Sequence, residues 1–181
     1  MAATPTEELD TSAGRAVLPP WQLLDSLPAA LVAGNDRVAA FRQALADGGN
    51  SLRQRFDEDE PIEGLVRDRA RMVDIVLRHA WALHTASGGK DVALIAVGGY
   101  GRRELYPHSD VDVLVLLPHP LDRDGAAFVE RFIGTLWDIG LEIGHSVRTI
   151  AECEAEMSTD IATRTSLLEH LRTQARVWVL G

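Results

Sequence analysis

Two aspartates stand one residue apart where a strongly apolar segment begins. Asp110 and Asp112 flank Val111, and the run VLVLL follows them. Because side chains alternate across a strand, both carboxylates are expected on one face, with α-carbons about 6.6 Å apart. Carboxylates are costly in an apolar strand unless a positive charge compensates them. Magnesium suits such a pair, since it takes a few carboxylates and completes its shell with water and substrate phosphates.

A double glycine lies about ten residues before the aspartates. Gly98 and Gly99 end a short apolar segment, and a turn without β-carbons presents its amide N–H groups to a phosphate. Ser109 could donate to a phosphate oxygen, and Arg102 and Arg103 could reach the same anion. Together with the aspartates, these residues predict a metal-dependent site for a nucleoside triphosphate.

Two other phosphate-binding motifs are excluded by the same segment. The dinucleotide fingerprint fails because Glu104 stands where the third glycine belongs, after Gly99 and Gly101. A P-loop fails because no Gly-Lys-Ser/Thr follows the glycines.

The composition limits the classes of partner that the chain is expected to bind. The net charge of −9 argues against a nucleic-acid substrate, because such binding neutralises many phosphates. No apolar run approaches the roughly 20 residues that span a bilayer, and the N-terminus lacks the pattern of a secretory signal. Cys153 is the only cysteine, which excludes an intrachain disulfide. We therefore expect a cytoplasmic protein without a nucleic-acid or membrane partner.

The first 60 residues are expected to lie outside the core domain. Residues 1–20 are interpreted as a disordered tail, and residues 21–60 as a helical extension that ends in an acidic linker. Within the extension, Asp47-Gly48-Gly49-Asn50 is expected to separate two helical pieces, residues 36–46 and 51–56.

Residues 61–181 are expected to form an α+β domain of α/β type, a short mixed sheet flanked by helices. Apolar residues at three- and four-residue steps predict a long helix from Ile62 to near Gly88-Gly89, with Trp81 in the core. Further elements are expected as strands at 92–97, 111–117 and 141–150, and as helices at 128–139, where Trp137 is assigned to the core, after Ala151 and after Asp160.

The glycine and aspartate segment also carries a family resemblance. GGYGRRELYPHSDVDVLVL, residues 98–116, resembles the signature of the nucleotidyltransferase domain of the bifunctional PII uridylyltransferase/uridylyl-removing enzymes, which belong to the DNA polymerase β-like superfamily. LWDIGLEIGHSVRTIAECEAEM, residues 136–157, is similar to a second segment of that family. The stretch from Asp160 to Glu169 resembles the next one.

The resemblance implies a polymerase β-like core and a specific reaction. Gly98, Gly99 and Ser109 would hold the triphosphate, and Asp110 and Asp112 would hold Mg²⁺. The implied reaction transfers UMP from UTP to a tyrosine of the PII nitrogen-regulatory protein and releases pyrophosphate.

The chain departs from the family pattern at three places. Arg103 stands where some relatives carry glycine, and Gly144 stands where the superfamily often has a third carboxylate. Glu142 and Asp160 are the candidates to replace that carboxylate, and the alternative interpretation of each is an ordinary surface acid. After Glu169 the pattern is lost, so the core is expected to be truncated at its C-terminal end. The alternatives are a degenerate nucleotide-binding regulatory module without turnover and a nucleotidyltransferase that acts on a different acceptor; the base preference stays open.

Overall fold

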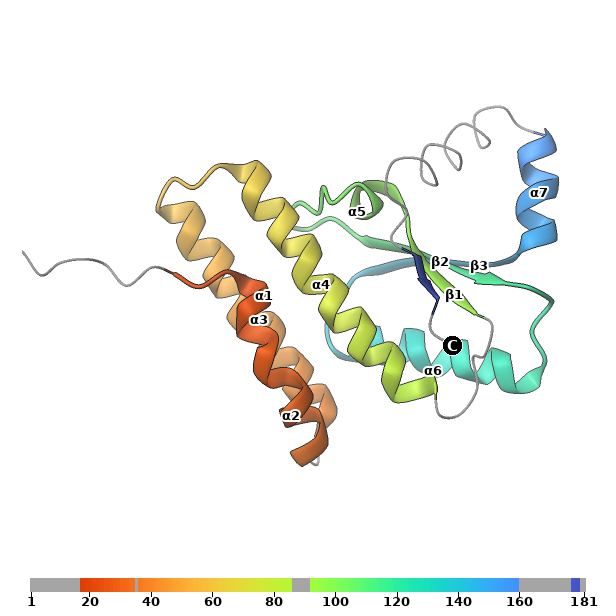
Figure 1. The fold of residues 1–181 in the computed structure, drawn as a ribbon, viewed down its shortest axis with the longest axis horizontal. Helices are drawn as coiled ribbons and strands as arrows, with labels where there is room; N and C mark the ends of the chain where they lie inside the picture. The colour runs from red at the N-terminus through yellow and green to blue at the C-terminus, as the bar shows by residue number, and fades with distance from the viewer. Residues whose placement is uncertain (1–16, 35, 86–91, 160–176, 180–181) are drawn as a thin grey trace, which may run out of the picture.

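The computed structural model describes residues 17–34, 36–85, 92–159 and 177–179. Helices dominate the first half of the chain, and helices and strands alternate in the second half (Figure 1). In chain order the elements are α1 (Pro20–Leu23), the 3-10 helix η1 (Leu24–Ser26), α2 (Leu27–Ala33), α3 (Arg37–Asp57), α4 (Ile62–Thr85), β1 (Ala93–Ala96), α5 (Gly98–Gly101), β2 (Val111–Leu117), α6 (Arg123–Asp138), β3 (Ile143–Thr149), α7 (Ile150–Thr159) and β4 (Val177–Val179).

The four strands form one mixed sheet in the order β3-β2-β1-β4. β1 pairs antiparallel with both β2 and β4, whereas β2 and β3 are parallel. Parallel neighbours require a crossover, and α6 supplies it between β2 and β3. The expected α+β class and mixed sheet are therefore confirmed. β4 has no counterpart among the expected elements, since three residues are too few for a periodic pattern.

The main core lies between the sheet and helices α4 and α6. Alternate residues of β2, from Val111 to Leu117, join the buried side chains of both helices on this face. Trp81 of α4 lies at its centre. Its ring makes edge-to-face contacts with the rings of Phe128 and Phe132, at centroid distances of 5.0 and 4.9 Å. Helices α1 to α3 lie on the far side of α4 from the sheet (Figure 1). The opposite face of the sheet carries a much smaller cluster of Ile95, Leu114 and Cys153.

Local signals fix where several helices begin. The side chain of Asp36 accepts the N–H of Ala39 at the start of α3, and Asp122 does the same for Gly125 at the start of α6. Thr149 and Glu152 form a reciprocal cap before α7, since each accepts the other's backbone N–H. That cap ends β3 and turns the chain away from the sheet edge.

One expectation about the helical extension is wrong. Residues 47–50 do not separate two helices, because α3 runs without a break from Arg37 to Asp57. Gly48 is buried, and a β-carbon there would lie 2.2 Å from Sδ of Met72 on α4. The glycine is therefore a point of close approach between α3 and α4 rather than a turn.

The turn between these two helices is held by an ion-pair cluster. The Arg55 guanidinium contacts both carboxylate oxygens of Glu60, at 2.5 and 2.7 Å, and one oxygen of Asp68 at 2.8 Å. The acidic residues expected to be a solvated linker thus include one, Glu60, that ties α3 to the start of α4.

The long helix, the strand at 111–117 and the helix before β3 are all present where the sequence predicts them. The predicted helix after Asp160, the helix end near residues 88–89 and most of the predicted tail lie outside the described residues. The proposed domain boundary at residue 60 stays a prediction. In the part of the chain that the structure describes, no helix combines the length and the apolar character needed to cross a membrane.

Candidate active site

The two aspartates lie at the start of β2, on the sheet face that the main core does not cover. Asp112 is the second residue of β2 and is half-buried, whereas Asp110 immediately precedes the strand and is exposed. Val111 between them is 2% exposed and belongs to the main core. This alternation agrees with the expected placement of both carboxylates on one face.

The carboxylate of Asp112 is in an unfavourable position for a negative charge. Burial raises its pKa above the ordinary value, and the nearby negative charge of Asp110 raises it further. Within the described residues, neither carboxylate has a hydrogen bond or an ion pair. Two close carboxylates without a cation among their neighbours form a site whose electrostatics favour a bound positive ion.

Two glycines fit closely around Asp112. A β-carbon on Gly98 would lie 2.6 Å from Oδ2 of Asp112, and one on Gly144 would lie 2.3 Å from Oδ1. Gly98 also has a φ of +62°, which disfavours any residue with a side chain. Gly144 pairs with Asp112 in the β2–β3 ladder, so it lies beside the carboxylate in the neighbouring strand. The carboxylate is thus oriented by backbone on both sides.

The glycine segment forms one helical turn, α5, instead of an open loop. Val97 donates its N–H to the carbonyl of Asp112 at 3.0 Å, which joins the segment to β2. Tyr100 is buried and donates its hydroxyl to Oδ1 of Asp74 on α4 at 2.6 Å. Through Tyr100, this contact couples the segment that contains Gly98 and Gly99 to the long helix α4.

The other predicted phosphate ligands surround this turn. Arg102 is engaged with Glu104, Nε to Oε2 at 2.9 Å, and both side chains are about half exposed. Such an exposed pair is worth little, so Arg102 can exchange it for a phosphate. Arg103 is exposed and has a φ of +63°, in the left-handed region that glycine adopts without steric strain. The backbone at position 103 would therefore suit a glycine. Ser109 is half-buried directly before Asp110.

A hollow of about 540 Å³ opens beside Asp110. Trp137, Glu142 and Gly144 contribute to its lining. Trp137 is 56% exposed, so its assignment to the core is wrong. Trp137 is the penultimate residue of α6, and the chain turns toward β3 directly after the helix ends. The indole side chain of Trp137 gives the hollow a flat apolar wall.

A third carboxylate does not complete the site among the described residues. They contain no group of three or more His, Cys, Asp or Glu side chains that could hold a metal ion, so Glu142 does not join Asp110 and Asp112 as a ligand. Asp160 lies outside the described residues. Two carboxylates still fit Mg²⁺, which commonly binds one or two protein carboxylates and fills its remaining positions with water and phosphate oxygens.

Comparison with known proteins agrees with this geometry. Residues 82–170 match the family model described as a nucleotidyltransferase domain. The chain is 46% identical over 136 residues to a bifunctional uridylyltransferase/uridylyl-removing enzyme of Nitrosospira multiformis, and 51% identical over 134 residues to that of Cupriavidus metallidurans. A protein of the same name from Pseudomonas putida is 44% identical over 135 residues.

These alignments cover 72 to 74% of this chain but only 15% of each relative. The chain thus spans a small part of the length of the enzymes it matches. The matched segment contains the glycine turn, both aspartates and the β2–β3 pair that encloses Asp112. Residues 82–170, which hold the candidate site, are therefore similar to the nucleotidyltransferase domain family.

Proposed function

We propose that this chain is the Mg²⁺-dependent nucleotidyltransferase part of a uridylyltransferase, which moves UMP from UTP to a tyrosine of a PII protein and releases pyrophosphate. The observation that carries the proposal is the orientation of Asp112, whose two carboxylate oxygens lie against Gly98 and Gly144 while Asp110 stands beside it. The name of the similar enzymes, uridylyltransferase, supports the choice of nucleotide.

Each residue has a defined part in this proposal. Asp110 and Asp112 would hold Mg²⁺, which supplies charge neutralisation for the triphosphate and acidifies the attacking hydroxyl. Gly98 and Gly99 bring the backbone of α5 close to the phosphates, and Ser109 donates its hydroxyl to a phosphate oxygen. Arg102 and Arg103 meet the charge that develops on the departing pyrophosphate.

The reaction exchanges one phosphorus–oxygen bond for another. The tyrosine oxygen forms a bond to the α-phosphorus, and the bond from that phosphorus to the bridging oxygen of the β-phosphate breaks. The phenolic proton leaves to solvent, and the electron pair of the broken bond departs with pyrophosphate. The hollow beside Asp110 leaves space for an acceptor side chain to approach.

The proposed partners follow from the family that the chain resembles and not from the composition of the chain. UTP and the PII protein are reaction partners, and the cytoplasm is the proposed location because both are cytoplasmic molecules in the family that the chain resembles. The acidic composition, with a net charge of −9, is consistent with an acceptor other than a nucleic acid.

The test is a transfer assay with UTP labelled at the α-phosphate. The chain is incubated with Mg²⁺, labelled UTP and a PII protein, and label on PII is compared with pyrophosphate released. We expect transfer by the wild type and none by the double variant Asp110→Asn/Asp112→Asn. Asp25→Asn, which changes an exposed aspartate in η1, serves as the matched control and should transfer normally.

Each outcome separates the proposal from its alternatives. Label transfer that survives in the double variant contradicts the assigned role of the aspartates. Metal-dependent UTP binding without pyrophosphate release identifies a non-catalytic nucleotide-binding module. Release of pyrophosphate with label on an acceptor other than PII identifies a different transferase.

A further inference from the structure

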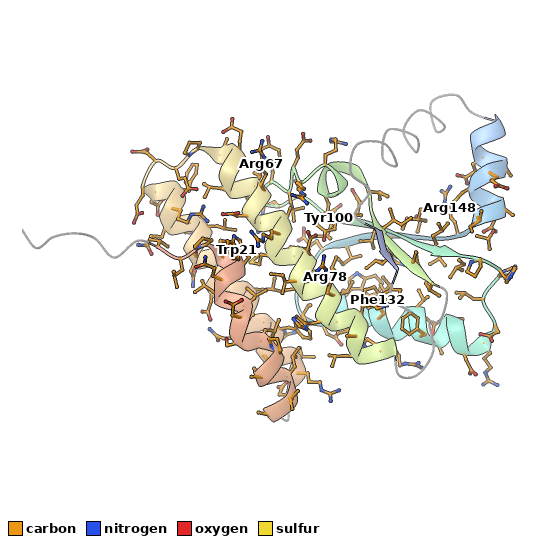
Figure 2. All side chains as sticks on the ribbon, in the orientation of Figure 1. Trp21, Arg67, Arg78, Tyr100, Phe132 and Arg148 are labelled. Atoms are coloured by element: carbon orange, nitrogen blue, oxygen red, sulfur yellow. The ribbon has the colours of Figure 1, made fainter. Side chains whose placement is uncertain are left out.

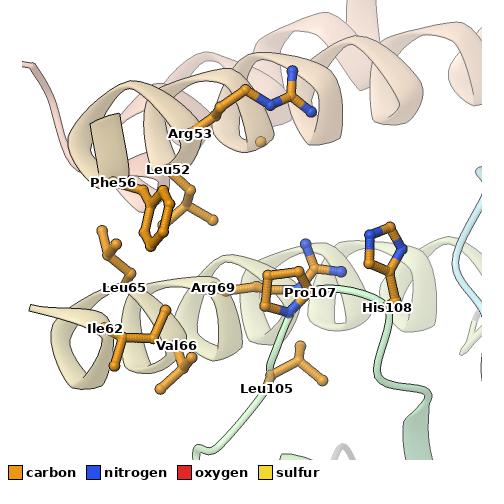
Figure 3. Close-up of a pocket in the computed structure, with 11 residues that line it drawn as sticks. Leu52, Arg53, Phe56, Ile62, Leu65, Val66, Arg69, Leu105, Pro107 and His108 are labelled. Carbon is orange, nitrogen blue, oxygen red and sulfur yellow. The ribbon is translucent and has the colours of Figure 1, made fainter. Parts of the chain in front are cut away.

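A second cavity, of about 390 Å³, lies between α3, α4 and the loop that leads to the aspartates (Figure 3). Its two ends differ in chemistry. Leu52, Phe56, Ile62 and Leu65 gather at one end, and the guanidinium groups of Arg53 and Arg69 lie toward the other, where His108 is also found. None of the residues that line it carries a carboxylate.

Arg69 is the residue that gives this cavity a functional meaning. Its Nε is buried without a hydrogen-bond partner in the part of the chain that the structure describes. Burial lowers its pKa, and attraction to Glu142 offsets only part of that effect. Arg69 is half-buried, and a guanidinium that loses much of its contact with water normally pairs with an anion, because the desolvation is otherwise costly. Arg69 therefore keeps hydrogen-bonding capacity for an anion in the cavity, in addition to its attraction to Glu142.

The position of Arg69 in the helix sharpens this point. It lies three residues after Val66 and four before Val73, on the face of α4 that packs inward. Arg55, which is buried near the turn between α3 and α4, is engaged with Glu60 and Asp68. Those acids are therefore already committed to Arg55, and Arg69 faces the cavity.

The remaining walls define what accompanies the anion. Leu65, Val66 and Leu105 are at most 5% exposed and form an apolar floor, and the ring of Phe56 closes one side (Figure 3). The volume suits a small organic molecule and exceeds what a single inorganic ion needs.

We propose that this cavity binds a small organic anion, with a phosphate or carboxylate held by Arg69 and Arg53 and an apolar, preferably aromatic, body against Phe56, Leu65 and Leu105. The site is separate from the pair of aspartates, and it does not rest on the proposed nucleotidyl transfer. It lies close to that pair in the chain, since His108 of its rim is followed by Ser109 and Asp110.

The test is a calorimetric titration of the chain with phenyl phosphate in the absence of divalent metal. Inorganic phosphate and phenol are titrated in parallel, because each carries only half of the proposed chemistry. We expect phenyl phosphate to bind at least tenfold more tightly than either. Equal binding of inorganic phosphate would contradict the apolar half of the proposal, and no binding of phenyl phosphate would overturn it.

Two variants locate the binding. Arg69→Met keeps the apolar stem and removes the charge, a change that buried ionic sites commonly tolerate. Gly49→Leu leaves every charge in place and fills the cavity, because a β-carbon on Gly49 meets no atom within 4 Å. Both should weaken phenyl phosphate binding at least tenfold. Arg67→Met, on the exposed side of the same helix, is the matched control and should bind normally (Figure 2).

The final arm separates a free small molecule from part of the nucleotide. Phenyl phosphate binding should persist in Asp110→Asn/Asp112→Asn and should resist displacement by Mg²⁺ and UTP added together. Displacement by Mg²⁺ and UTP would show that the cavity is a subsite of the nucleotide, which overturns a separate site. Binding that survives in both Arg69→Met and Gly49→Leu would place the probe elsewhere and would overturn it as well. Circular dichroism spectra of all variants confirm that each one is folded.

Discussion

Replacement of Gly144 by alanine adds one methyl group where the structure has no room for it. Its β-carbon would lie 2.3 Å from Oδ1 of Asp112, and real β-carbon contacts are essentially never shorter than 3.0 Å. Either the carboxylate or strand β3 must therefore move by about 0.7 Å or more. The carboxylate is the more mobile of the two, because the opposing strand is held by seven residue pairs along β2.

The size of the effect follows from that displacement. A shift of about 1 Å in a reacting group costs on the order of 10²-fold in rate, so pyrophosphate release should fall by about that factor. Divalent metal binding should weaken about tenfold, which corresponds to about 1.4 kcal/mol. The free energy of unfolding should change less, because alanine is favoured over glycine in a strand by about 0.5–1 kcal/mol and offsets part of the crowding.

Titration with Mn²⁺, followed by electron paramagnetic resonance, measures the metal affinity directly. Gly134→Ala is the matched control, since its β-carbon would meet no atom within 4 Å, and it should bind Mn²⁺ as the wild type does. If Gly144→Ala also binds Mn²⁺ and turns over normally, then the orientation of Asp112 does not matter and the reasoning about the site is refuted.

Four further substitutions test the electrostatics of the site and the packing of the helices that support it. Asp112→Asn should raise the melting temperature of the metal-free chain at neutral pH, because the folded state raises the pKa of Asp112 and so disfavours its charge. The wild type becomes more stable as the pH falls through the raised pKa of Asp112 in the folded state, because the carboxylate is then protonated. The difference in melting temperature between variant and wild type should therefore vanish in acid. A difference that grows in acid would be evidence against burial of that charge. Gly48→Val should destabilise the chain by about 1–3 kcal/mol in urea unfolding, because its side chain meets the methionine sulfur of the facing helix, whereas Gly49→Ala in open space should stabilise it by about 0.5–1 kcal/mol. Equal effects at the two glycines would contradict the close helix contact. Tyr100→Phe should cost about 1–2 kcal/mol by removing the 2.6 Å hydrogen bond to Asp74, and an unchanged unfolding midpoint would mean that this bond does not anchor the glycine turn.

The elements that position the site were predictable because their patterns are local. β2 is an unbroken apolar run after two aspartates, and the alternation rule correctly assigned Val111 to the core. The helix from Ile62 repeats its apolar residues at helical spacing over many turns. Both signals extend over enough residues to outweigh local exceptions.

The errors arose where a tertiary contact overrides a local preference. Gly48 and Gly49 are typical of a turn in sequence, but the proximity of Met72 makes a glycine necessary within a helix. Trp137 carries an apolar side chain at the end of α6, where the chain turns away and leaves it exposed. Neither the approach of Met72 to Gly48 nor the exposure of Trp137 can be inferred from the neighbouring residues in the sequence.

The site itself was predictable in part. The aspartates and the double glycine can be recognised in the sequence by residue type and spacing. The close contact of Gly144 with Asp112, however, depends on the register between β2 and β3. Arg69 was missed, although one signal was available: an arginine at the inward-facing spacing of an amphipathic helix calls for an anion. The helix pattern does not indicate which anion the proposed cavity site would bind.

The most direct test of the central claim is a crystal structure of the chain with Mn²⁺ and a UTP analogue that cannot be cleaved at the α-phosphate. The account predicts an anomalous scattering peak in contact with the carboxylates of both Asp110 and Asp112, bridged to phosphate oxygens that face the α5 turn. A manganese peak that contacts neither aspartate, with the triphosphate bound elsewhere, would contradict it.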